Sequence, residues 1–273
     1  MVVNMDLDIL RLQALKTGLS LNYISKDEKL TELLSQLAES FPEHVVLKGG
    51  TALNRVHLSQ LGVARFSEDV DLDYISPVTL NQKIKEIEKG MRRITGFTVS
   101  PKRQIHRTLR FNCSYVNELD HRDVVRAEFY LSHSKILAAK KPQKAVLSSP
   151  FTFGKIPQMI CYCLEDLLGQ KLVALHERTE GKDIYDAYYA LDLDFDPLLL
   201  ERSHSKILVF KKIRKTTQEF RDNLIRKLQK AQTEATYTGK STNHYIPSNL
   251  RPNWKTFIPT LADKIESKMA IIK

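Results

Sequence analysis

The sequence predicts an α/β protein whose first part contains a mixed sheet and whose second part is helical. Between residues 44 and 132, apolar runs and alternating patterns typical of strands occur among helical stripes. Beyond residue 157, only the helical period remains. Residues 148–157, rich in Pro, Gly and Ser, separate the two parts. We therefore expect one domain at residues 1–150 and a helical domain at residues 151–273.

The first part alternates helices and strands. The leucines from Leu30 to Leu37 have a period of 3.6 residues, and Ser25 with Glu28 is typical of a capping box before them. Ser76-Pro77 indicates the start of a further helix. This order of elements favours a sheet of mixed direction. The expected strands are 44–47, 69–75, 97–100, 108–116 and 124–132, and a helix is expected at 51–58.

The second part combines helical stripes with basic charge. Apolar residues follow the helical period at Leu164–Leu175 and at Ile184–Leu191. The segment Arg202–Lys230 keeps such a stripe but is rich in Lys and Arg, with Glu219 and Asp222 as its acids. The whole chain of 273 residues carries a formal net charge of +10. This charge suits a polyanion such as RNA, although it also serves solubility.

Several classes of protein are excluded by composition. No apolar run approaches the length needed to span a membrane. Asp6 and Asp8 near the beginning are atypical of a signal peptide. The cysteines, Cys113, Cys161 and Cys163, suggest neither a disulfide framework nor a zinc site. We expect a cytoplasmic protein.

Alternating acids on one predicted strand are the first sign of chemistry. Side chains along a strand point alternately to opposite faces, so Asp69, Asp71 and Asp73 share one face. Neighbouring carboxylates repel each other unless a cation lies between them. Mg²⁺ prefers oxygen ligands and commonly binds one or two carboxylates together with substrate phosphates. We expect Asp69 and Asp71 to bind metal, and Asp73 either to support these ligands or to have a structural role.

A glycine pair between a strand and a helix is the second sign. Gly49 and Gly50 follow Lys48 and precede Thr51, so backbone N–H groups at a helix start can bind phosphate there. Ser67 lies at the turn before the acidic strand and either bonds backbone or reaches a phosphate. Glycines mark most tight turns, and alternating acids also protect solvated edges. Together, however, they predict phosphoryl or nucleotidyl transfer.

The same motifs resemble a known family. The segments Lys48–Leu53 and Arg65–Leu72 are similar to the signature of the AbiEii/AbiGii toxins, as are Lys171–Leu175, Arg178 and Lys182–Asp186. These proteins, with the MenT-like toxins, belong to the polymerase-beta-type nucleotidyltransferase superfamily. The resemblance implies a polymerase-beta-type nucleotidyltransferase domain with a mixed sheet, followed by a C-terminal helical domain.

The resemblance also implies an activity. The protein would transfer a nucleoside monophosphate from a nucleoside triphosphate to RNA, notably the 3′ end of tRNA, and release pyrophosphate. Mg²⁺ is the implied cofactor, with two ions expected and Mn²⁺ possible as a substitute. A cognate antitoxin is the implied protein partner. The implied nucleotide-binding residues are Lys48, Gly49, Gly50, Thr51, Ser67, Lys171 and Asp186.

A third carboxylate is expected at Glu128. Two-metal phosphoryl transfer needs acids that bind both ions and one that activates the attacking hydroxyl. Glu128 is the acid well inside the predicted strand 124–132, and the superfamily has its third carboxylate on such a strand. We therefore expect Glu128 to act in catalysis and to bind metal. Alternatively, it is an exposed residue paired with Arg126.

Charged residues in the second part allow two interpretations. Lys171 and Arg178 lie two turns apart on nearly the same helix face, and Asp183 and Asp186 also share a face. A lysine on an apolar face is costly to bury without an anionic partner. The partner is either a triphosphate or an interhelical network of these four residues. The resemblance favours a catalytic role for Lys171 and Asp183.

Two other functions remain open at this point. An antibiotic-type nucleotidyltransferase acting on small molecules would need acids to meet a cationic drug, which the basic segment Arg202–Lys230 disfavours. A non-catalytic RNA-binding protein on the same fold would be expected to have lost some of its acids, whereas the acids at Asp69 and Asp71 are present.

Overall fold

The computed structural model describes residues 6–131, 137–153 and 156–269, and it divides into two compact units. The first unit comprises residues 1–136 and 142–161, and the second comprises residues 137–141 and 162–273. The sequence places the boundary at residue 150. The first unit extends further because the strand β8 (Gln158–Cys161) pairs in parallel with β1 (Val45–Lys48) and completes the sheet.

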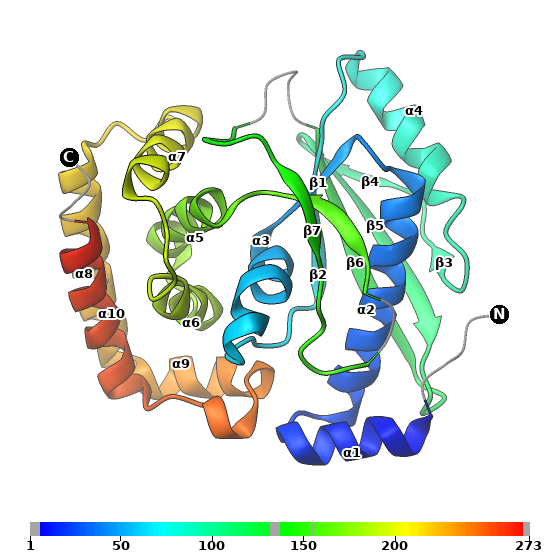
Figure 1. Ribbon diagram of the computed structural model, residues 1–273, viewed down its shortest axis with the longest axis horizontal. Helices are drawn as coiled ribbons and strands as arrows, with labels where there is room; N and C mark the ends of the chain where they lie inside the picture. Colours follow the sequence, from blue (N-terminus) through cyan, green and yellow to red (C-terminus); the bar gives the residue numbers. More distant parts are fainter. Residues whose placement is uncertain (1–5, 132–136, 154–155, 270–273) are drawn as a thin grey trace. The chain divides into compact units, whose positions relative to one another are not determined.

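The first unit is built on an eight-stranded mixed sheet with the order β3-β5-β6-β2-β1-β8-β7, and β4 also pairs with β5 (Figure 1). The central strand β2 (Asp69–Tyr74) is antiparallel to β1 and parallel to β6 (Arg122–Leu131). This confirms the predicted fold class. The other strands are β3 (Thr98–Val99), β4 (Arg103–Ile105), β5 (Thr108–Val116) and β7 (Gln143–Val146).

Helices cover the apolar face of this sheet. Val70, Leu72 and Tyr74 of β2 are buried, and the Tyr74 hydroxyl donates to Glu86 of α4 (Leu80–Met91) over 2.7 Å. The helix α2 (Leu21–Ser40) packs on the sheet beside α4, and α1 (Leu7–Thr17) packs on α2. The opposite face carries the acids of β2.

Two helix starts differ from the prediction. Ser20, not Ser25, caps α2, and Ser25 lies inside the helix, where its hydroxyl donates to Glu118. The helix α4 begins after Thr79, because Thr79 and Gln82 form the capping box that Ser76-Pro77 does not provide. In both cases the sequence contains competing cap residues a few positions apart. Of the predicted strands, 108–116 is confirmed without change, and Ser132 of the strand 124–132 lies outside the described residues.

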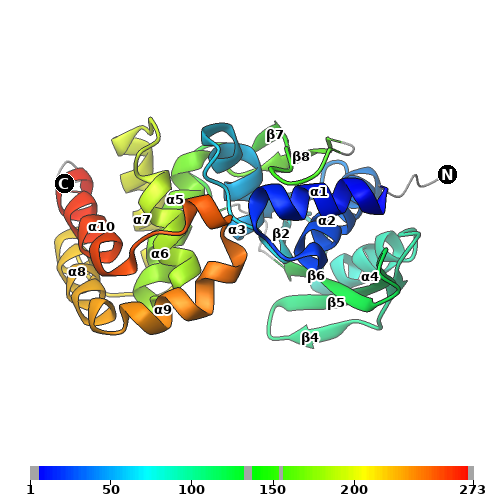
Figure 2. The same ribbon diagram turned by 90° about the horizontal axis from the view of Figure 1, so that it is seen from below.

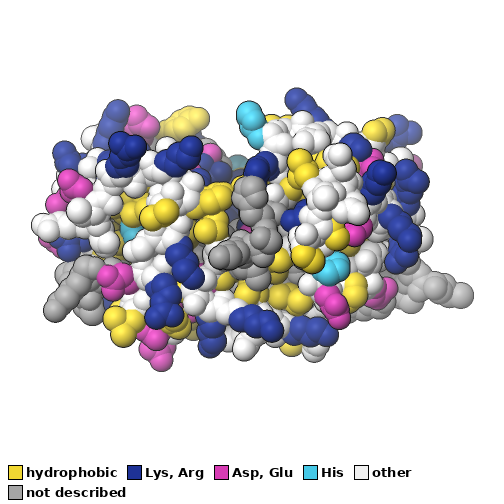
Figure 3. Space-filling view, turned by 90° about the horizontal axis from the view of Figure 1, so that it is seen from above, with side chains coloured by type: hydrophobic (Ala, Val, Ile, Leu, Met, Phe, Trp, Pro, Cys, Tyr) yellow, Lys and Arg dark blue, Asp and Glu magenta, His cyan; other side chains and the backbone are white. Residues whose placement is uncertain are grey.

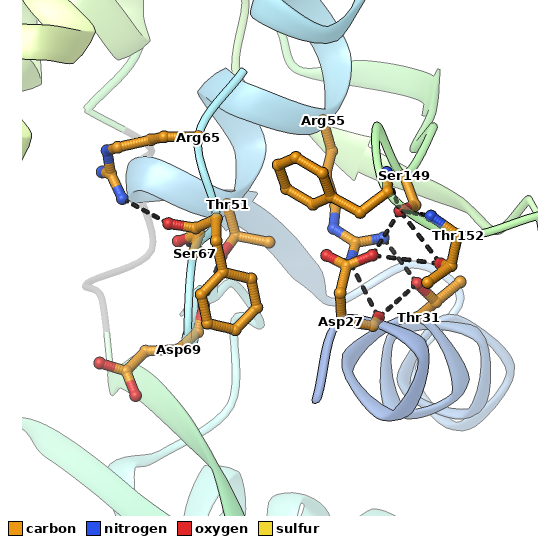
Figure 4. Close-up of polar contacts among 11 residues, drawn as sticks. Asp27, Thr31, Thr51, Arg55, Arg65, Ser67, Asp69, Ser149 and Thr152 are labelled. Carbon is orange, nitrogen blue, oxygen red and sulfur yellow. Dashed lines mark hydrogen bonds and ion pairs between the residues drawn. The ribbon is translucent and has the colours of Figure 1, made fainter. Parts of the chain in front are cut away.

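The helix after the glycine turn is irregular. It begins as α3 (Gly49–Ala52), continues as the π-helical turn η1 (Leu53–His57) and ends as the 3₁₀ turn η2 (Leu58–Leu61). Arg55 in η1 is buried and donates to Asp27 over 2.7 Å and to Thr31 over 2.8 Å, both in α2. This network holds η1 against α2, as Figure 4 shows.

The second unit consists of helices. Buried apolar residues hold α5 (Leu164–Arg178) against α7 (Pro197–Phe210), while α8 (Thr217–Thr233) packs beside α10 (Trp254–Met269), as Figure 2 shows. The basic segment Arg202–Lys230 is not continuous, because the chain leaves α7 at Lys211 and starts α8 at Thr217. The remaining elements are α6 (Gly181–Ala190), α9 (Ala235–Thr242), η3 (Asn243–Tyr245) and η4 (Ser248–Leu250).

Two surface properties bear on function. Lysine and arginine side chains are scattered over the face shown in Figure 3, as the net charge of +10 requires. Within the described ranges, no helix is both long enough and apolar enough to cross a membrane.

Candidate active site

The acids of β2 lie beside the glycine turn that ends β1. Lys48 of β1 is the direct register partner of Asp71, and Asp71 is in turn the partner of Glu128 on β6. Because side chains alternate along β2, Asp69 lies on the same face as Asp71. The sheet therefore brings together Lys48, Asp69, Asp71 and Glu128, which the sequence predicted as site residues.

Gly49 permits the close approach of Asp71. Its φ is +70°, a conformation that residues with a side chain rarely adopt. A Cβ atom at Gly49 would collide with the Asp71 carboxylate oxygen Oδ2. The first turn of α3 and an acidic side chain are therefore in direct contact, which is possible because position 49 has no side chain.

Thr51 connects the glycine turn to the start of β2. Its hydroxyl is 2.5 Å from the Asp69 carbonyl oxygen and 2.9 Å from the Ser67 hydroxyl (Figure 4). A carbonyl oxygen only accepts, so Thr51 donates to Asp69 and accepts from Ser67. Thr51 is buried, which leaves its hydroxyl engaged within the protein, whereas Ser67 is partly exposed.

Lys48 and Asp73 form an ion pair next to the acids. The Lys48 ammonium is 2.5 Å from Asp73 Oδ1 and lies 4.9 Å above the Tyr130 ring. Asp73 is buried, and this lysine compensates its charge. The structural role expected for Asp73 is thus to hold Lys48 at the edge of the site.

Two arginines that the sequence did not assign to the site bind its carboxylates. Arg110 of β5 is 2.8 Å from Glu128, whereas Arg126 of β6 is 4.0 Å from Glu128 and 3.6 Å from Asp69. The sequence predicted Arg126 as the alternative partner of Glu128, yet Arg110 is the closer one. Its position could not be predicted without the register of β5 against β6, which depends on the connection between these strands.

The donor set suits a hard cation that also binds substrate. Asp69 and Asp71 present two carboxylates on one face, and Mg²⁺ commonly takes one or two carboxylates and completes its shell with phosphates and water. Among the described residues, no three His, Cys, Asp or Glu side chains gather so as to hold a metal ion by themselves. Glu128 is directed to Arg110 instead, so its role as a metal ligand stays a prediction.

The second unit contains a buried network of ion pairs. The Lys171 ammonium is 2.9 Å from Asp183 and 2.9 Å from Asp186, and Arg178 is 2.6 Å from Asp183. Burial alone would raise the pKa of Asp183, but Lys171 and Arg178 lower this pKa to about 2. The network is the structural alternative considered above, and whether Lys171 also meets a triphosphate stays a prediction.

Two solved structures have a similar fold. The nucleotidyltransferase toxin MenT4 from Mycobacterium tuberculosis H37Rv matches with a TM-score of 0.64 at 17% identity, over 98% of this chain and 99% of that chain. JHP933 from Helicobacter pylori matches with a TM-score of 0.51 at 17% identity, over 93% of this chain and 97% of that chain. These similarities concern the fold. No curated protein matches the sequence.

The family itself is shown by the sequence. Residues 32–266 match the family described as nucleotidyl transferase AbiEii toxin of type IV toxin–antitoxin systems. The match covers most of the chain and includes the glycine turn, the acids of β2, Glu128 and the Lys171 network. The chain belongs to the AbiEii family of nucleotidyltransferase toxins.

Proposed function

We propose that this protein transfers a nucleoside monophosphate from a nucleoside triphosphate to an RNA acceptor, most specifically the 3′ end of tRNA, with release of pyrophosphate. The observation that carries the proposal is the contact between Gly49 and the Asp71 carboxylate. It joins a helix start, which can bind phosphate, to a carboxylate that can bind a cation.

The proposed roles at the sheet follow from these positions. Asp69 and Asp71 would hold Mg²⁺, as two ions, or Mn²⁺ in its place. When bound, the metal would neutralise charge on the triphosphate and lower the pKa of an attacking hydroxyl. The backbone N–H groups of Gly49, Gly50 and Thr51 would bind phosphate oxygens, with Ser67 and Lys48 beside them.

Glu128 would accept the proton of the acceptor hydroxyl and complete the metal ligands. A general base must be deprotonated and within hydrogen-bonding distance of the proton that it takes. The ion pair with Arg110, at 2.8 Å, holds the Glu128 side chain away from such a proton. For this role the Glu128 side chain would leave Arg110 and turn toward the acceptor hydroxyl and the metal.

Lys171 would contribute a positive charge to the triphosphate, with Asp183 and Asp186 holding its ammonium in place. Both carboxylates are completely buried, and both lie 2.9 Å from the lysine nitrogen. A lysine held by two acids has little freedom to rotate away, so its ammonium has a fixed position. Membership of a toxin–antitoxin family supports a cognate antitoxin as protein partner, and the net charge of +10 supports RNA as acceptor.

The test is incubation of the protein with total tRNA and each labelled nucleoside triphosphate in turn. We expect incorporation of one or more labels, and loss of it in Asp69→Ala and Asp71→Ala. Thermal melting of the same samples shows whether the variants remain folded. Asp123→Ala, which removes an acid elsewhere in the same unit, serves as the control. Transfer at the wild-type rate by Asp69→Ala or Asp71→Ala would contradict the assignment of the site.

A second variant tests Glu128. Glu128→Gln keeps the size of the side chain and removes its charge, so transfer should slow by about 10²-fold or more, as expected when general-base assistance is lost. An unchanged rate would place the third carboxylate elsewhere.

A further inference from the structure

A row of charged residues crosses the sheet of the first unit. Lys48, Asp71, Glu128, Arg110 and Arg103 are direct register partners on β1, β2, β6, β5 and β4. Direct partners in a sheet point to the same face, so this row runs along the face that bears the candidate site. The acids lie at its centre, and the arginines lie toward β4.

At the arginine end of the row, the positive charge of Arg103 and Arg110 exceeds the negative charge of the residues paired with them. Arg103 is exposed, and within the described part of the chain no acid pairs with it. It lies directly opposite Arg110, and like charges opposite each other destabilise a sheet. An anion bound between these two arginines would remove that repulsion.

Arg110 also has a hydrogen-bond donor without an acceptor. Its Nη2 binds Glu128 over 2.8 Å, but its Nε is buried and lacks a hydrogen-bond partner among the described residues. A buried donor without an acceptor costs free energy, and a guanidinium can bind two oxygens of one phosphate side by side. Glu128 therefore satisfies only part of this side chain.

Arg126 continues the positive surface along β6. Its side chain is 44% exposed, and its distances to Asp69 and Glu128 are 3.6 and 4.0 Å, too long for strong hydrogen bonds. Asn112, its exposed register partner on β5, adds a polar group that can donate to an anion. The surface thus extends from β4 to β6.

We propose that Arg103, Arg110 and Arg126 bind the phosphates of a single-stranded polynucleotide beside the carboxylates of the site. The three arginines are spread over two strand spacings, about 10 Å, which is too wide for a single phosphate and suits successive phosphates of one strand. This inference rests on the proposed function, because it places the RNA acceptor on the face that carries Asp69 and Glu128.

The carboxylates compete with the polynucleotide for these arginines. Arg110 is bound to Glu128, and Arg126 is nearest to Asp69. A phosphate must displace these acids unless a cation draws them away. Neutralising Glu128 should therefore strengthen polynucleotide binding, and it should do so through Arg110.

The experiment measures binding of a fluorescent single-stranded oligoribonucleotide to the full chain by anisotropy, without divalent metal and at several salt concentrations. Arg110→Gln and Arg126→Gln should each weaken binding several-fold and reduce the log–log salt slope by about 0.7, the value for one contact to a single strand. Arg93→Gln, which removes an exposed arginine after α4, is the matched control and should bind as the wild type does.

Glu128→Gln should bind the oligoribonucleotide several-fold more tightly than wild type, a gain that unfolding cannot produce. If the loss of a negative charge strengthened binding in a general way, the affinity would increase equally whether or not Arg110 is present. The proposed competition instead requires the gain to disappear in the double variant Arg110→Gln/Glu128→Gln. Arg103→Gln should also weaken binding of the oligoribonucleotide, whereas its binding of a nucleoside triphosphate with Mg²⁺ should be unchanged, because Arg103 is exposed on β4 and is separated from Glu128 by β5. This difference separates polynucleotide phosphates from those of the nucleotide.

Three results would overturn the inference. If Arg110→Gln binds as tightly as Arg93→Gln, the strand docks elsewhere, and nucleotide transfer to RNA by the wild type would still support the proposed function. If Glu128→Gln strengthens binding equally in both backgrounds, the competition does not exist. If the wild type neither binds the oligoribonucleotide nor labels RNA, the proposed function fails as well.

Discussion

The backbone conformation of Gly49 contributes directly to the candidate site. Its φ of +70° disfavours any side chain, and a Cβ there would also collide with Asp71. Gly62 has a similar φ of +68°, but a Cβ there would meet nothing within 4 Å. The two glycines thus share the left-handed conformation, but only Gly49 contacts the acid.

We predict that Gly49→Ala is more destabilising than Gly62→Ala. The left-handed conformation costs both variants about 1 kcal/mol, and the collision with Asp71 adds to this in Gly49→Ala alone. Urea unfolding gives the two free energies, and labelling of RNA should be lost in Gly49→Ala but kept in Gly62→Ala. Equal stability and equal activity of the two variants would mean that the Asp71 contact has no effect.

Lys171 is the residue whose loss should affect folding most among the charged site residues. Lys171→Met leaves the buried carboxylates of Asp183 and Asp186 without this partner, a change that typically costs about 3–5 kcal/mol. The control is Lys211→Met, because Lys211 pairs with Glu177 at the surface, where such a pair contributes about 0–1 kcal/mol. Thermal melting at pH 7 should separate the two variants clearly. A melting temperature of Lys171→Met close to that of Lys211→Met would show that the network does not stabilise the fold.

A small aromatic group joins three helices of the second unit. Phe220 of α8 is stacked on His176 of α5 at 4.6 Å between ring centroids and contacts His204 of α7 at 4.5 Å. His204 is completely buried, and neither ring nitrogen has a hydrogen-bond partner in the described part of the chain. Burial, with His176 nearby, lowers the pKa of His204 to about 4, and burial with Lys227 and Lys215 also lowers the pKa of His176.

We predict that the second unit loses stability as the pH falls from about 6.5 to about 4. In that range the unfolded chain binds a proton at His204 and the folded chain does not, so the free energy of unfolding rises with pH. For a shift of this size the effect is on the order of 3 kcal/mol. His204→Phe, with a ring of similar size, should flatten the dependence of the melting temperature on pH between 4 and 6.5. An unchanged slope would show that His204 does not titrate on unfolding.

The elements differ in how far the sequence predicts them. The strands β2, β5 and β6 could be predicted, because polar and apolar side chains alternate along the sequence of each over six or more positions. The strands β4, β7 and β8 have three or four residues, too few for a periodic pattern, and β8 has its partner β1 far away in the sequence. Their existence depends on tertiary pairing, which a local pattern does not contain.

The same distinction applies to the site. Asp69 and Asp71 could be assigned because their spacing alone places them on one face. Arg110 could not, because its position opposite Glu128 depends on the register of two strands. The sequence predicted regular helix where the structure has the π-helical turn η1. The π-helical geometry accompanies the burial of Arg55 against Asp27 of another helix, and a local pattern does not contain this contact. Side chains fixed by long-range register are thus the part of the site that only the structure provides.

The charge of the whole molecule predicts a salt-dependent association with RNA. The connection between α7 and α8 contains Lys211, Lys212, Arg214 and Lys215, of which Lys211 already pairs with Glu177. Replacing all four with Gln should therefore remove at most three phosphate contacts and lower the log–log salt slope of RNA binding by up to about 2. Nucleotide affinity should barely change. Identical binding curves for this variant and the wild type would assign the cluster to solvent-exposed charge alone.

The pairing of β1 with β8 has a consequence for synthesis of the protein. The ribosome releases the chain from its N-terminus, so β1 can pair with β2 early, whereas β8 ends only at Cys161. Until then, the strand that carries the glycine turn has one unpaired edge, and pairing over such a distance is slow. A chain interrupted before Cys161 would lack this central pairing. We therefore expect incomplete chains to be inactive. The toxin would then become active in the cell only after translation has passed well beyond Asp69, Asp71 and Glu128.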